Sequence, residues 1–346
     1  MILAAIAVVA FSLSWGGVAL IRRWAAHYRL LDVPNPRSSH TRPTPRGGGL
    51  AIVVAVCGVF GVWLLATESW PPELLGLLLA QLLVAGVGLA DDAITLSSAF
   101  RLVVHVVAAA VLLSVAGGLT FGVPLLGTTL SPVAIPLILL WLVGLTNAYN
   151  FMDGIDGIAG GQAVMAGAGW VLIGWMVDEP QVRLLGVLLT AASAGFLLQN
   201  WPPARVFMGD VGSGFLGFTF GAMTIIGATY DAIVALSGAL LVWPFLFDTG
   251  LTLVRRLWRG ENPLRAHRSH LYQRLVIAGC GHRDVTVLYI LLAGTGLLAA
   301  VALLARWPGA GIGVAVGIPS LAAGLVRYVR SSERLSQPGS SGAPAR

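Results

Sequence analysis

Long apolar stretches recur along almost the whole chain, and they constrain its fold more than any other feature. A helix needs about 20 mainly apolar residues to cross a bilayer. The sequence contains about eleven such stretches, at roughly residues 2–21, 47–66, 73–90, 102–117, 133–149, 158–177, 183–199, 213–229, 232–250, 285–305 and 310–328. We therefore predict an all-α fold, a polytopic membrane helix bundle of about 11 transmembrane helices.

The composition agrees with this prediction. Only 10% of the residues are charged and 57% are hydrophobic, which leaves too few polar groups to cover a soluble globular protein. No shift in composition divides the chain and no internal repeat is visible, so we predict one integral membrane domain over residues 1–330. Residues 331–346, whose end is rich in Ser, Pro and Gly, are predicted to form a disordered cytoplasmic tail.

The arginines predict the orientation of the bundle. All 21 basic residues are arginines, and eleven spans would place 19 of them on one side and two, Arg183 and Arg306, on the other. The positive-inside rule then places the N-terminus outside and the C-terminus in the cytoplasm. Because the net charge of +6 is explained by the lipid bilayer, we expect no nucleic-acid partner. Most polar motifs fall on the arginine side, so chemistry is expected to face the cytoplasm.

Two adjacent carboxylates, Asp91 and Asp92, stand where the third apolar stretch ends. Neighbouring carboxylates at a membrane boundary repel each other, and a cation, an arginine or a shared proton normally offsets that repulsion. Arg101 and His105 follow at the start of the next stretch. The alternative is a solvated helix end. We favour a functional role for the pair.

The run LTNAYNFMDGIDGIAGG, residues 145–161, carries Asn147, Asn150, Asp153 and Asp156 at steps of three residues. This spacing drifts only slowly around a helix, so the four side chains could point into one cavity. Four oxygen-bearing side chains with no cation between them form a hard, anionic site suited to Mg²⁺, hydroxyls or ring N–H groups. A helix cap, the alternative, needs one such residue rather than four.

Asp210 stands in the run RVFMGDVGSGFLGF, residues 205–218, just before an apolar stretch. The free N–H groups at a helix N-terminus favour anions such as phosphate. The alternative is that Asp210 serves only as the helix cap. Arg205 upstream and the small residues 212–214 downstream favour a metal ligand beside a phosphate site.

The longest basic loop contains ENPLRAHRSHLYQRL, residues 261–275. His267 and His270 could ligate zinc, but no Cys or third His stands at ligand spacing. A loop held to anionic lipid would explain the arginines but not the histidines. A surface for sugar and phosphate explains the set better: His267, Arg268, His270, Gln273 and Arg274.

These motifs, in this order and over nearly the whole chain, resemble the polyprenyl-phosphate N-acetylhexosamine-1-phosphate transferase superfamily, glycosyltransferase family 4, which includes the MraY and WecA enzymes. Residues 32–49 agree, since they contain elements resembling that family's Asp-x-Pro, Arg-x-x-His and Pro-x-Gly-Gly. The resemblance implies transfer of a sugar phosphate from a UDP-sugar donor to undecaprenyl phosphate in the bacterial inner membrane. UMP is released, and Mg²⁺ is the implied cofactor.

The resemblance also implies roles for single residues. It makes Asn150 and Asp210 the metal ligands, and Asp91 and Asp92 the catalytic carboxylates. The lipid phosphate has a second pKa of about 6 and is already largely dianionic, so orientation by Asp91 matters more than deprotonation. The remaining roles are donor binding by Asn147, Asp153, Asp156, His267, His270 and Arg274, and phosphate or lipid binding by Arg101 and Arg205.

The late loop indicates a branch of this family. Relatives that use a muramoyl-pentapeptide donor show a richer run of histidines there, whereas here Leu271 and Tyr272 follow His270. We therefore expect the branch that starts O-antigen or related surface glycans from UDP-GlcNAc or a deoxy-HexNAc. A phospho-N-acetylmuramoyl-pentapeptide transferase, a membrane transporter or flippase, and a catalytically silent scaffold stay open as alternatives, as does a homodimer.

Overall fold

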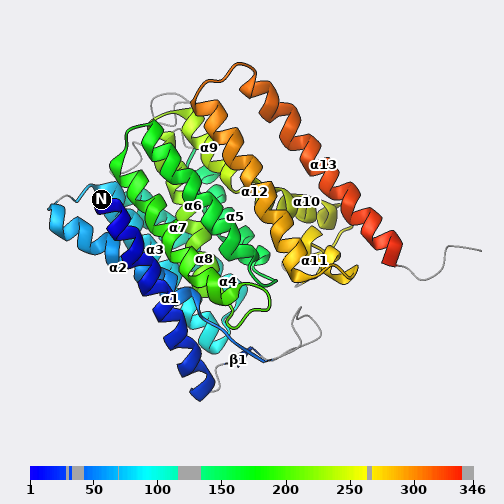
Figure 1. The fold of residues 1–346 in the computed structure, drawn as a ribbon, viewed down its shortest axis with the longest axis horizontal. Helices are drawn as coiled ribbons and strands as arrows, with labels where there is room; N and C mark the ends of the chain where they lie inside the picture. Colours follow the sequence, from blue (N-terminus) through cyan, green and yellow to red (C-terminus); the bar gives the residue numbers. More distant parts are fainter. Residues whose placement is uncertain (29–30, 33–42, 69, 116–133, 263–266, 337–346) are drawn as a thin grey trace, which may run out of the picture.

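The computed structural model describes residues 1–346 except 29–30, 33–42, 69, 116–133, 263–266 and 337–346. The described chain is a helical bundle (Figure 1). Its helices are α1 (Ile2–Tyr28), α2 (Gly49–Thr67), α3 (Pro72–Ile94), α4 (Ser98–Val115), α5 (Ala134–Met152), α6 (Ile158–Met176), α7 (Pro180–Asn200), α8 (Asp210–Ala228), α9 (Ala232–Leu241), α10 (Trp243–Trp258), α11 (Leu271–Ile277), α12 (His282–Leu304) and α13 (Ala310–Ser336). Two short strands, β1 (Leu31–Asp32) and β2 (Thr44–Pro45), pair antiparallel with Leu31 opposite Pro45.

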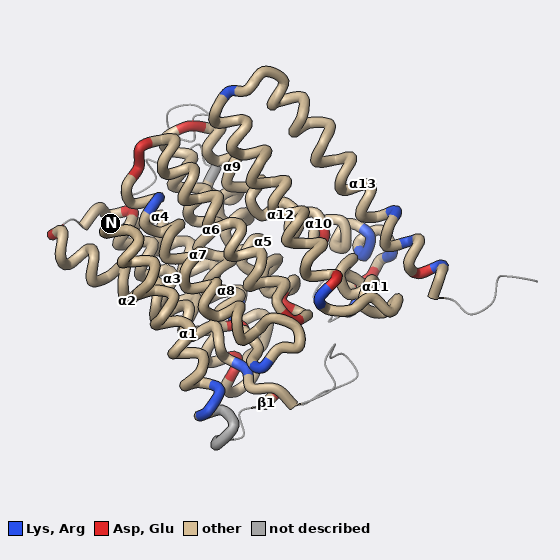
Figure 2. The backbone as a smooth tube through the Cα atoms, in the orientation of Figure 1, with Lys and Arg blue, Asp and Glu red and all other residues tan. Residues whose placement is uncertain are grey.

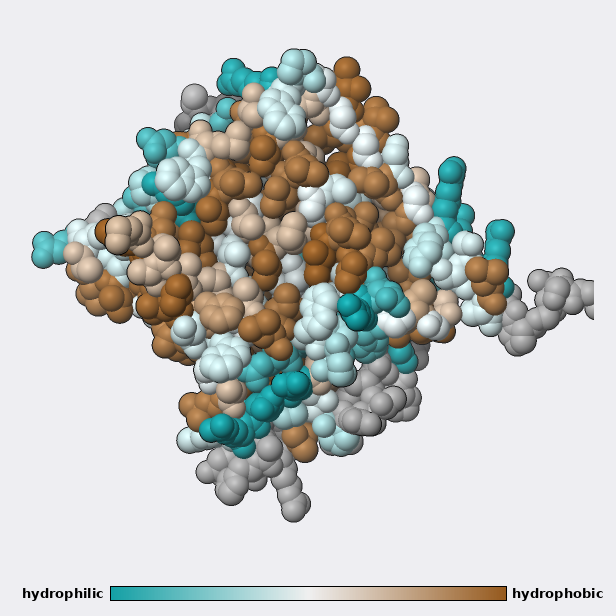
Figure 3. Space-filling view, in the orientation of Figure 1, coloured by the Kyte–Doolittle hydropathy of each residue, from teal (hydrophilic) through white to brown (hydrophobic). Residues whose placement is uncertain are grey.

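The predicted membrane bundle is confirmed. Ten of the described helices are long and apolar enough to cross a membrane, or eleven if the bent pair α9 and α10 counts as one span. Figure 3 shows a broad hydrophobic area across the middle of one face, with hydrophilic side chains gathered towards its ends. The chain is therefore a multi-pass membrane protein.

One predicted span is broken. The sequence predicts a single helix over residues 232–250, but α9 and α10 meet at a 75° bend. Pro244, in the first turn of α10, lacks the N–H that a continuous helix would need. The Leu241 carbonyl at the break accepts a hydrogen bond from Nε2 of Gln162 at 2.7 Å. A buried side chain thus satisfies the backbone group that the bend exposes.

Helix α8 lies at the centre of the bundle and is buried along almost its whole length, against α3 and α5. A Cβ at Gly217 would stand 2.7 Å from Cβ of Tyr149 on α5, so the two helices approach more closely than larger residues allow. Between α3 and α8, Nε2 of Gln81 donates to Oγ1 of Thr219 at 2.9 Å. This packing places Asp210, the first residue of α8, between neighbouring helices.

Charged residues gather at the ends of the bundle. Figure 2 shows basic residues near the end of α1, around α11 and at the end of α13. We call this the arginine-rich end; that it faces the cytoplasm stays a prediction. Helix α13 continues to Ser336, so the first six residues of the predicted tail are helical. Residues 337–346 of that tail lie outside the described residues, as do the predicted span ends at 116–117 and 133.

Candidate functional site

Asp91 and Asp92 are both nearly buried at the end of α3, and each meets an arginine. Nη1 of Arg101 donates to Oδ2 of Asp91 at 3.0 Å, and the Leu96 N–H donates to Oδ1 at 2.6 Å. Arg46 donates to Oδ1 of Asp92 through Nη2 at 2.6 Å and Nε at 3.1 Å. The repulsion expected between the two carboxylates is therefore offset by two guanidinium groups.

Asp92 also caps the N-terminus of α8. Its Oδ1 accepts the Asp210 N–H at 3.0 Å and its Oδ2 accepts the Val211 N–H at 3.2 Å. The preceding Gly209 has φ +77°, and a Cβ there would collide with the Asp92 carboxylate, so only glycine suits the position. Asp92 thus already occupies two N–H groups at this N-terminus, and the phosphate site predicted beside Asp210 stays a prediction.

The Asp210 side chain points away from its own helix N-terminus, which excludes the capping alternative. The N-cap is Gly209, and the Asp210 carboxylate forms an ion pair with Arg101. It is also within hydrogen-bonding reach of Asp91 and Asn150. Asn150 in turn donates through Nδ2 to Oγ of Ser213 at 3.0 Å. We call this group the acidic centre: Asp91, Asp92, Asn150, Asp210, Arg46 and Arg101.

The acidic centre has donors that suit Mg²⁺. Among the described residues no group of three or more His, Cys, Asp or Glu side chains forms a ready metal cage. Mg²⁺ is commonly bound through one or two carboxylates and completes its shell with water and substrate phosphates. Asp210 and Asp91 supply such carboxylates, and Asn150 contacts Ser213 and Asp210 through its amide nitrogen, so that its oxygen can face a cation.

The four polar residues of the 145–161 run have different contacts, and α5 ends at Met152, between Asn150 and Asp153. Asn150 joins the acidic centre, whereas Asn147 donates to the Val143 carbonyl at 2.7 Å and lines a separate groove. Asp156 accepts the Ala204 N–H at 3.0 Å and lies 3.4 Å from Nδ1 of His282. Asp156 therefore joins the loop before α8 to α12.

Asp153 lies just beyond the end of α5, close enough to the acidic centre for the charges there to shift the pKa of its carboxyl. Burial raises the pKa of its carboxyl well above the usual value, and the carboxylates of Asp210, Asp92 and Asp156 raise it further, while Arg46 lowers it. Its backbone N–H donates to the Asn150 carbonyl at 3.2 Å. Asp153 thus belongs to the electrostatic surroundings of the acidic centre.

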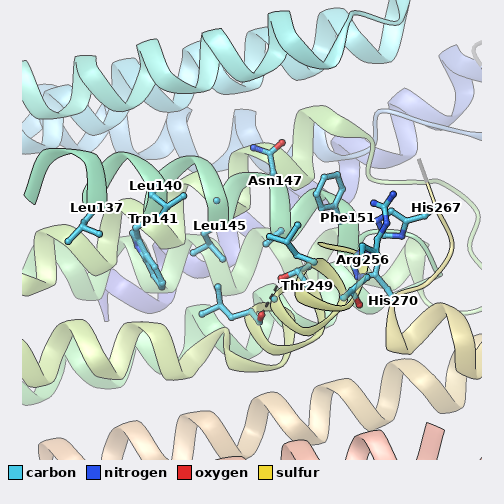
Figure 4. A pocket seen from close by; sticks show the side chains of 16 residues that line it. Leu137, Leu140, Trp141, Leu145, Asn147, Phe151, Thr249, Arg256, His267 and His270 are labelled. Atoms are coloured by element: carbon cyan, nitrogen blue, oxygen red, sulfur yellow. Dashed lines mark hydrogen bonds between the residues drawn. The ribbon is translucent and has the colours of Figure 1, made fainter. Parts of the chain in front are cut away.

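A groove of about 460 Å³ runs between α5 and α10. Figure 4 shows Leu137 and Trp141 towards one end and Phe151, Arg256, His267 and His270 towards the other. Apolar side chains form most of the walls, including Leu140 and Leu253, which are exposed on the side of the bundle. The groove is therefore amphipathic, and Asn147 connects it to the α5 segment that also carries Asn150.

Asp248, fully buried on α10, fixes the polar end of this groove. Its carboxylate accepts the N–H groups of Leu271 at 2.8 Å and Tyr272 at 3.1 Å, at the start of α11. It also accepts the Tyr289 hydroxyl at 2.6 Å and lies 3.3 Å from Nδ1 of His270. With Nδ1 held by Asp248, Nε2 is the ring nitrogen of His270 that remains for a ligand.

The two histidines of the late loop lie side by side, with ring centroids 4.9 Å apart. Burial, followed by the neighbouring His270 and Arg256, lowers the pKa of His267 from 6.5 to about 4, so His267 is neutral at pH 7. Its Nδ1 lies 2.8 Å from Oγ of Ser269. The pair presents ring nitrogens suited to hydrogen bonding.

The other predicted arginines are spread apart. Arg274 forms a two-pronged ion pair with Glu333 of α13, with both N···O distances 2.7 Å, and it is not among the residues that line the groove. Arg205 is exposed in the loop before α8. Arg101 alone of the three lies in the acidic centre. Arg37 and His40, which carry the Arg-x-x-His element, lie outside the described residues.

Sequence reasoning missed Arg46, Ser213 and Asp248 as site residues. Arg46 stands inside the Pro-x-Gly-Gly element, and that element pairs with the segment before α8: the Phe207 N–H donates to the Pro45 carbonyl at 2.7 Å and the Gly48 N–H to the Phe207 carbonyl at 2.9 Å. This pairing aligns Arg46 with Asp92. The sequence does contain a signal for Asp248 as a site residue, because it is a lone carboxylate within an apolar run.

Comparison with known proteins shows similarity to one family over most of the chain. The family model for glycosyl transferase family 4 matches residues 74–228, a range that contains Asp91, Asp92, Asn150 and Asp210. A probable undecaprenyl-phosphate N-acetylglucosaminyl 1-phosphate transferase of Bacillus subtilis is 30% identical over 285 residues, 79% of this chain and 77% of the relative. A decaprenyl-phosphate N-acetylglucosaminephosphotransferase of Mycolicibacterium smegmatis is 31% identical, over 82% of this chain and 76% of the relative.

A third relative, the undecaprenyl-phosphate alpha-N-acetylglucosaminyl 1-phosphate transferase of Escherichia coli K12, is 28% identical over 300 residues, 83% of this chain and 79% of the relative. The similarity therefore covers most of this chain and most of each relative. The chain belongs to the polyprenyl-phosphate N-acetylhexosamine-1-phosphate transferase superfamily, within glycosyl transferase family 4.

Proposed function

We propose that this protein transfers N-acetylhexosamine-1-phosphate from a UDP-sugar, UDP-GlcNAc or a UDP-deoxy-HexNAc, to undecaprenyl phosphate. UMP is released, and the lipid product starts a surface glycan such as O-antigen. The observation that carries the proposal is that α5 contributes to both sites: Asn150 belongs to the acidic centre, and Asn147, three residues earlier, lines the amphipathic groove. The names of the three relatives describe N-acetylglucosamine phosphate transfer to polyprenyl phosphates.

In this reaction an oxygen of the lipid phosphate forms a bond to the donor's β-phosphorus, and the bond from that phosphorus to the bridging oxygen breaks, so that UMP leaves. Mg²⁺, held by Asp210 and Asn150 with Asp91 beside them, would neutralise charge on the donor diphosphate. Arg101 lies at the same place and supplies a fixed positive charge. Catalysis of this kind depends chiefly on positioning and charge stabilisation.

Asp91 and Asp92 have different roles in the proposed reaction. The lipid phosphate, with a second pKa of about 6, needs little deprotonation at pH 7. We therefore give Asp91 the role of orienting groups in the acidic centre rather than that of a base. Asp92 acts as a positioning residue: it holds the start of α8 and Arg46, and thereby fixes the backbone that carries Asp210. Asp153 and Asp156 are proposed to serve the donor from the loop after α5.

The groove suits the amphiphilic acceptor together with the polar sugar. Its apolar walls between α5 and α10 would take the polyprenyl chain from the membrane side, whereas His267, His270, Arg256 and Asn147 would contact sugar and phosphate at the polar end. Because UDP-sugars are soluble, we propose that the arginine-rich end faces the cytoplasm of the bacterial inner membrane.

The proposal is tested with purified protein in nanodiscs, supplied with undecaprenyl phosphate and one donor at a time: UDP-GlcNAc, UDP-GalNAc, a UDP-deoxy-HexNAc or UDP-MurNAc-pentapeptide. We expect UMP release and a lipid-linked HexNAc diphosphate with a HexNAc donor and Mg²⁺, and loss of both products with EDTA. UMP release without undecaprenyl phosphate, or turnover only with the pentapeptide donor, would contradict the proposal.

We propose that the late loop, residues 261–275, determines the donor. The acidic centre serves the diphosphate and its metal, which are common to every donor, so it cannot distinguish sugars. A site that hydrogen-bonds a substrate group can reject an analogue lacking it by about 10⁴ to 10⁵. Exchange of this loop with that of a relative using another donor should therefore change the order of turnover rates among the UDP-sugars. If all rates fell together and their order stayed the same, residues outside this loop would determine the donor.

A further inference from the structure

A second polar pocket, of about 420 Å³, lies where the end of α10, the start of α11 and the end of α13 meet. We call it the basic pocket. One acidic side chain, Glu333, and six arginines are among the residues that line it; the arginines are Arg255, Arg256, Arg259, Arg268, Arg274 and Arg330. None of the reaction steps above uses the pocket as a whole.

Positive charge predominates in the basic pocket. Glu333 is bound by Arg274 through two contacts of 2.7 Å. Glu261, outside the pocket, is 3.0 Å from Nε of Arg256 and 3.9 Å from Nη1 of Arg259. Among the described residues, the six arginines thus lie near three carboxylates, Glu261, Glu333 and the buried Asp248, whose charge acts on Arg255 and Arg274. A concave site with this excess of guanidinium groups favours an anion with several oxygens, and phosphate groups have the geometry that arginine binds best.

The basic pocket borders a surface that suits lipid. On α10, Leu253, Val254, Leu257 and Trp258 are all exposed, and Trp258 is 85% exposed; their spacing places them on one stripe of the helix. Arg255 of the same helix and Arg259, its C-cap, line the pocket. Tyr328, exposed on α13, precedes Arg330 by two residues. Trp and Tyr concentrate at the membrane–water interface, so the pocket lies at the depth of lipid headgroups.

We propose that the basic pocket binds the phosphate headgroup of an anionic phospholipid, whose acyl chains extend along Leu257 and Trp258. Arg255, Arg259 and Arg330 would hold the phosphate. Basic pockets between helices at the cytoplasmic surface are suited to anionic headgroups. The pocket shares Thr252 and Arg256 with the amphipathic groove, so a bound lipid would stiffen the helix that carries Asp248.

The test is lipid binding by the full-length protein, measured by native mass spectrometry after removal of co-purified lipid. Phosphatidylglycerol is titrated into wild type, into Arg255→Gln/Arg330→Gln, and into Arg22→Gln/Arg23→Gln. The last variant removes the same charge from the end of α1, at the same end of the bundle. Each arginine near an anionic surface contributes about 1 kcal/mol, or about fivefold, so we expect binding to the pocket variant to weaken by roughly 25-fold and binding to the control variant to change little.

Three outcomes would overturn the proposal. Equal losses in both double variants would indicate general charge attraction. Equal binding of phosphatidylglycerol and phosphatidylcholine by wild type would remove the need for an anionic headgroup, and this comparison requires no variant. Displacement of the lipid by inorganic pyrophosphate at micromolar concentration would assign the pocket to a soluble phosphate instead.

Discussion

Asp92 and Asp248 have the same structural role in two regions of the molecule. Each is a nearly buried carboxylate that accepts two successive N–H groups at the start of a helix other than its own, α8 for Asp92 and α11 for Asp248. Their other partners differ. Asp92 has a guanidinium, Arg46, whereas Asp248 has the Tyr289 hydroxyl and the His270 ring.

This difference indicates two kinds of site. In the acidic centre carboxylates and arginines balance each other's charge, which is the environment in which a metal ion and phosphates bind. At the polar end of the groove, hydrogen bonds to one carboxylate fix the orientation of rings, which suits recognition of a sugar. The comparison leads to four predictions, from the largest expected effect to the smallest.

The largest effect is expected in the acidic centre. Asp210→Asn and Asn150→Ala should each lower turnover at least about 100-fold, the scale found when one transition-state partner is removed, because each removes an oxygen donor from the proposed metal site. Thermal unfolding in detergent should show that both variants remain folded.

The matched control is Asp178→Asn, the same chemical change in an exposed turn between α6 and α7. It should retain full turnover, since its left-handed backbone, φ 54°, accommodates Asn well. Near-normal turnover and Mg²⁺ response in Asp210→Asn would contradict the assignment of the metal ligands.

The second prediction concerns the ion pair of Asp92. Asp92→Asn should lower the free energy of unfolding by about 3 kcal/mol, because it removes one partner of a largely buried pair. Arg46→Gln should cost less, since Arg46 is the more exposed partner. The double variant should recover part of the loss, with a coupling energy of about 1–3 kcal/mol. Strictly additive losses would show that the pair is not a unit.

The third prediction concerns Asp248. Asp248→Asn should lower the free energy of unfolding by about 2 kcal/mol, since an amide cannot accept both helix N–H groups and the Tyr289 hydroxyl. Tyr289→Phe, which removes only one donor, should cost about 1 kcal/mol. If His270 depends on Asp248 for its orientation, Asp248→Asn should also raise the KM for the donor more than Tyr289→Phe does. Equal KM values in the two variants would show that Asp248 has a structural role only.

The smallest effect is a pH dependence from His267. Its pKa is lowered from 6.5 to about 4 in the folded protein, so below pH 6.5 the unfolded chain binds a proton that the native state does not. Stability is therefore lost as the pH falls from about 6.5 towards 4. His267→Gln should show a weaker loss of thermal stability between pH 7 and pH 5 than wild type. An identical pH profile would show that other groups determine it.

The sequence predicted the bundle well because membrane crossing depends on local apolar length, which is visible residue by residue. It could not predict the break at Val242, since the buried carbonyl of Leu241 is satisfied by Gln162 from α6, far along the chain. For a related reason, the sequence could not show which neighbours Asn147 and Asn150 contact. Their spacing is a local property, but α8 and α10 draw the two residues to different sites.

The charged residues show the same difference between local and long-range information. The sequence indicated that Asp91 and Asp92 need a cation, and Arg101 is indeed in contact with Asp91. The partner of Asp92 is Arg46, which the sequence did not identify, because it is brought there by backbone pairing between residues 45–49 and 207–208. Long-range pairing of this kind leaves no periodic signal in the sequence.

The most direct measurement uses UDP-GlcNAc labelled with ³²P in the β-phosphate, incubated with undecaprenyl phosphate and the purified protein. Transfer of the sugar together with its phosphate predicts that the label moves to the lipid and that unlabelled UMP is released, and that Asp210→Asn abolishes both while Asp178→Asn does not. Label that stays in released UDP, or a lipid product formed equally well by Asp210→Asn, would contradict the account.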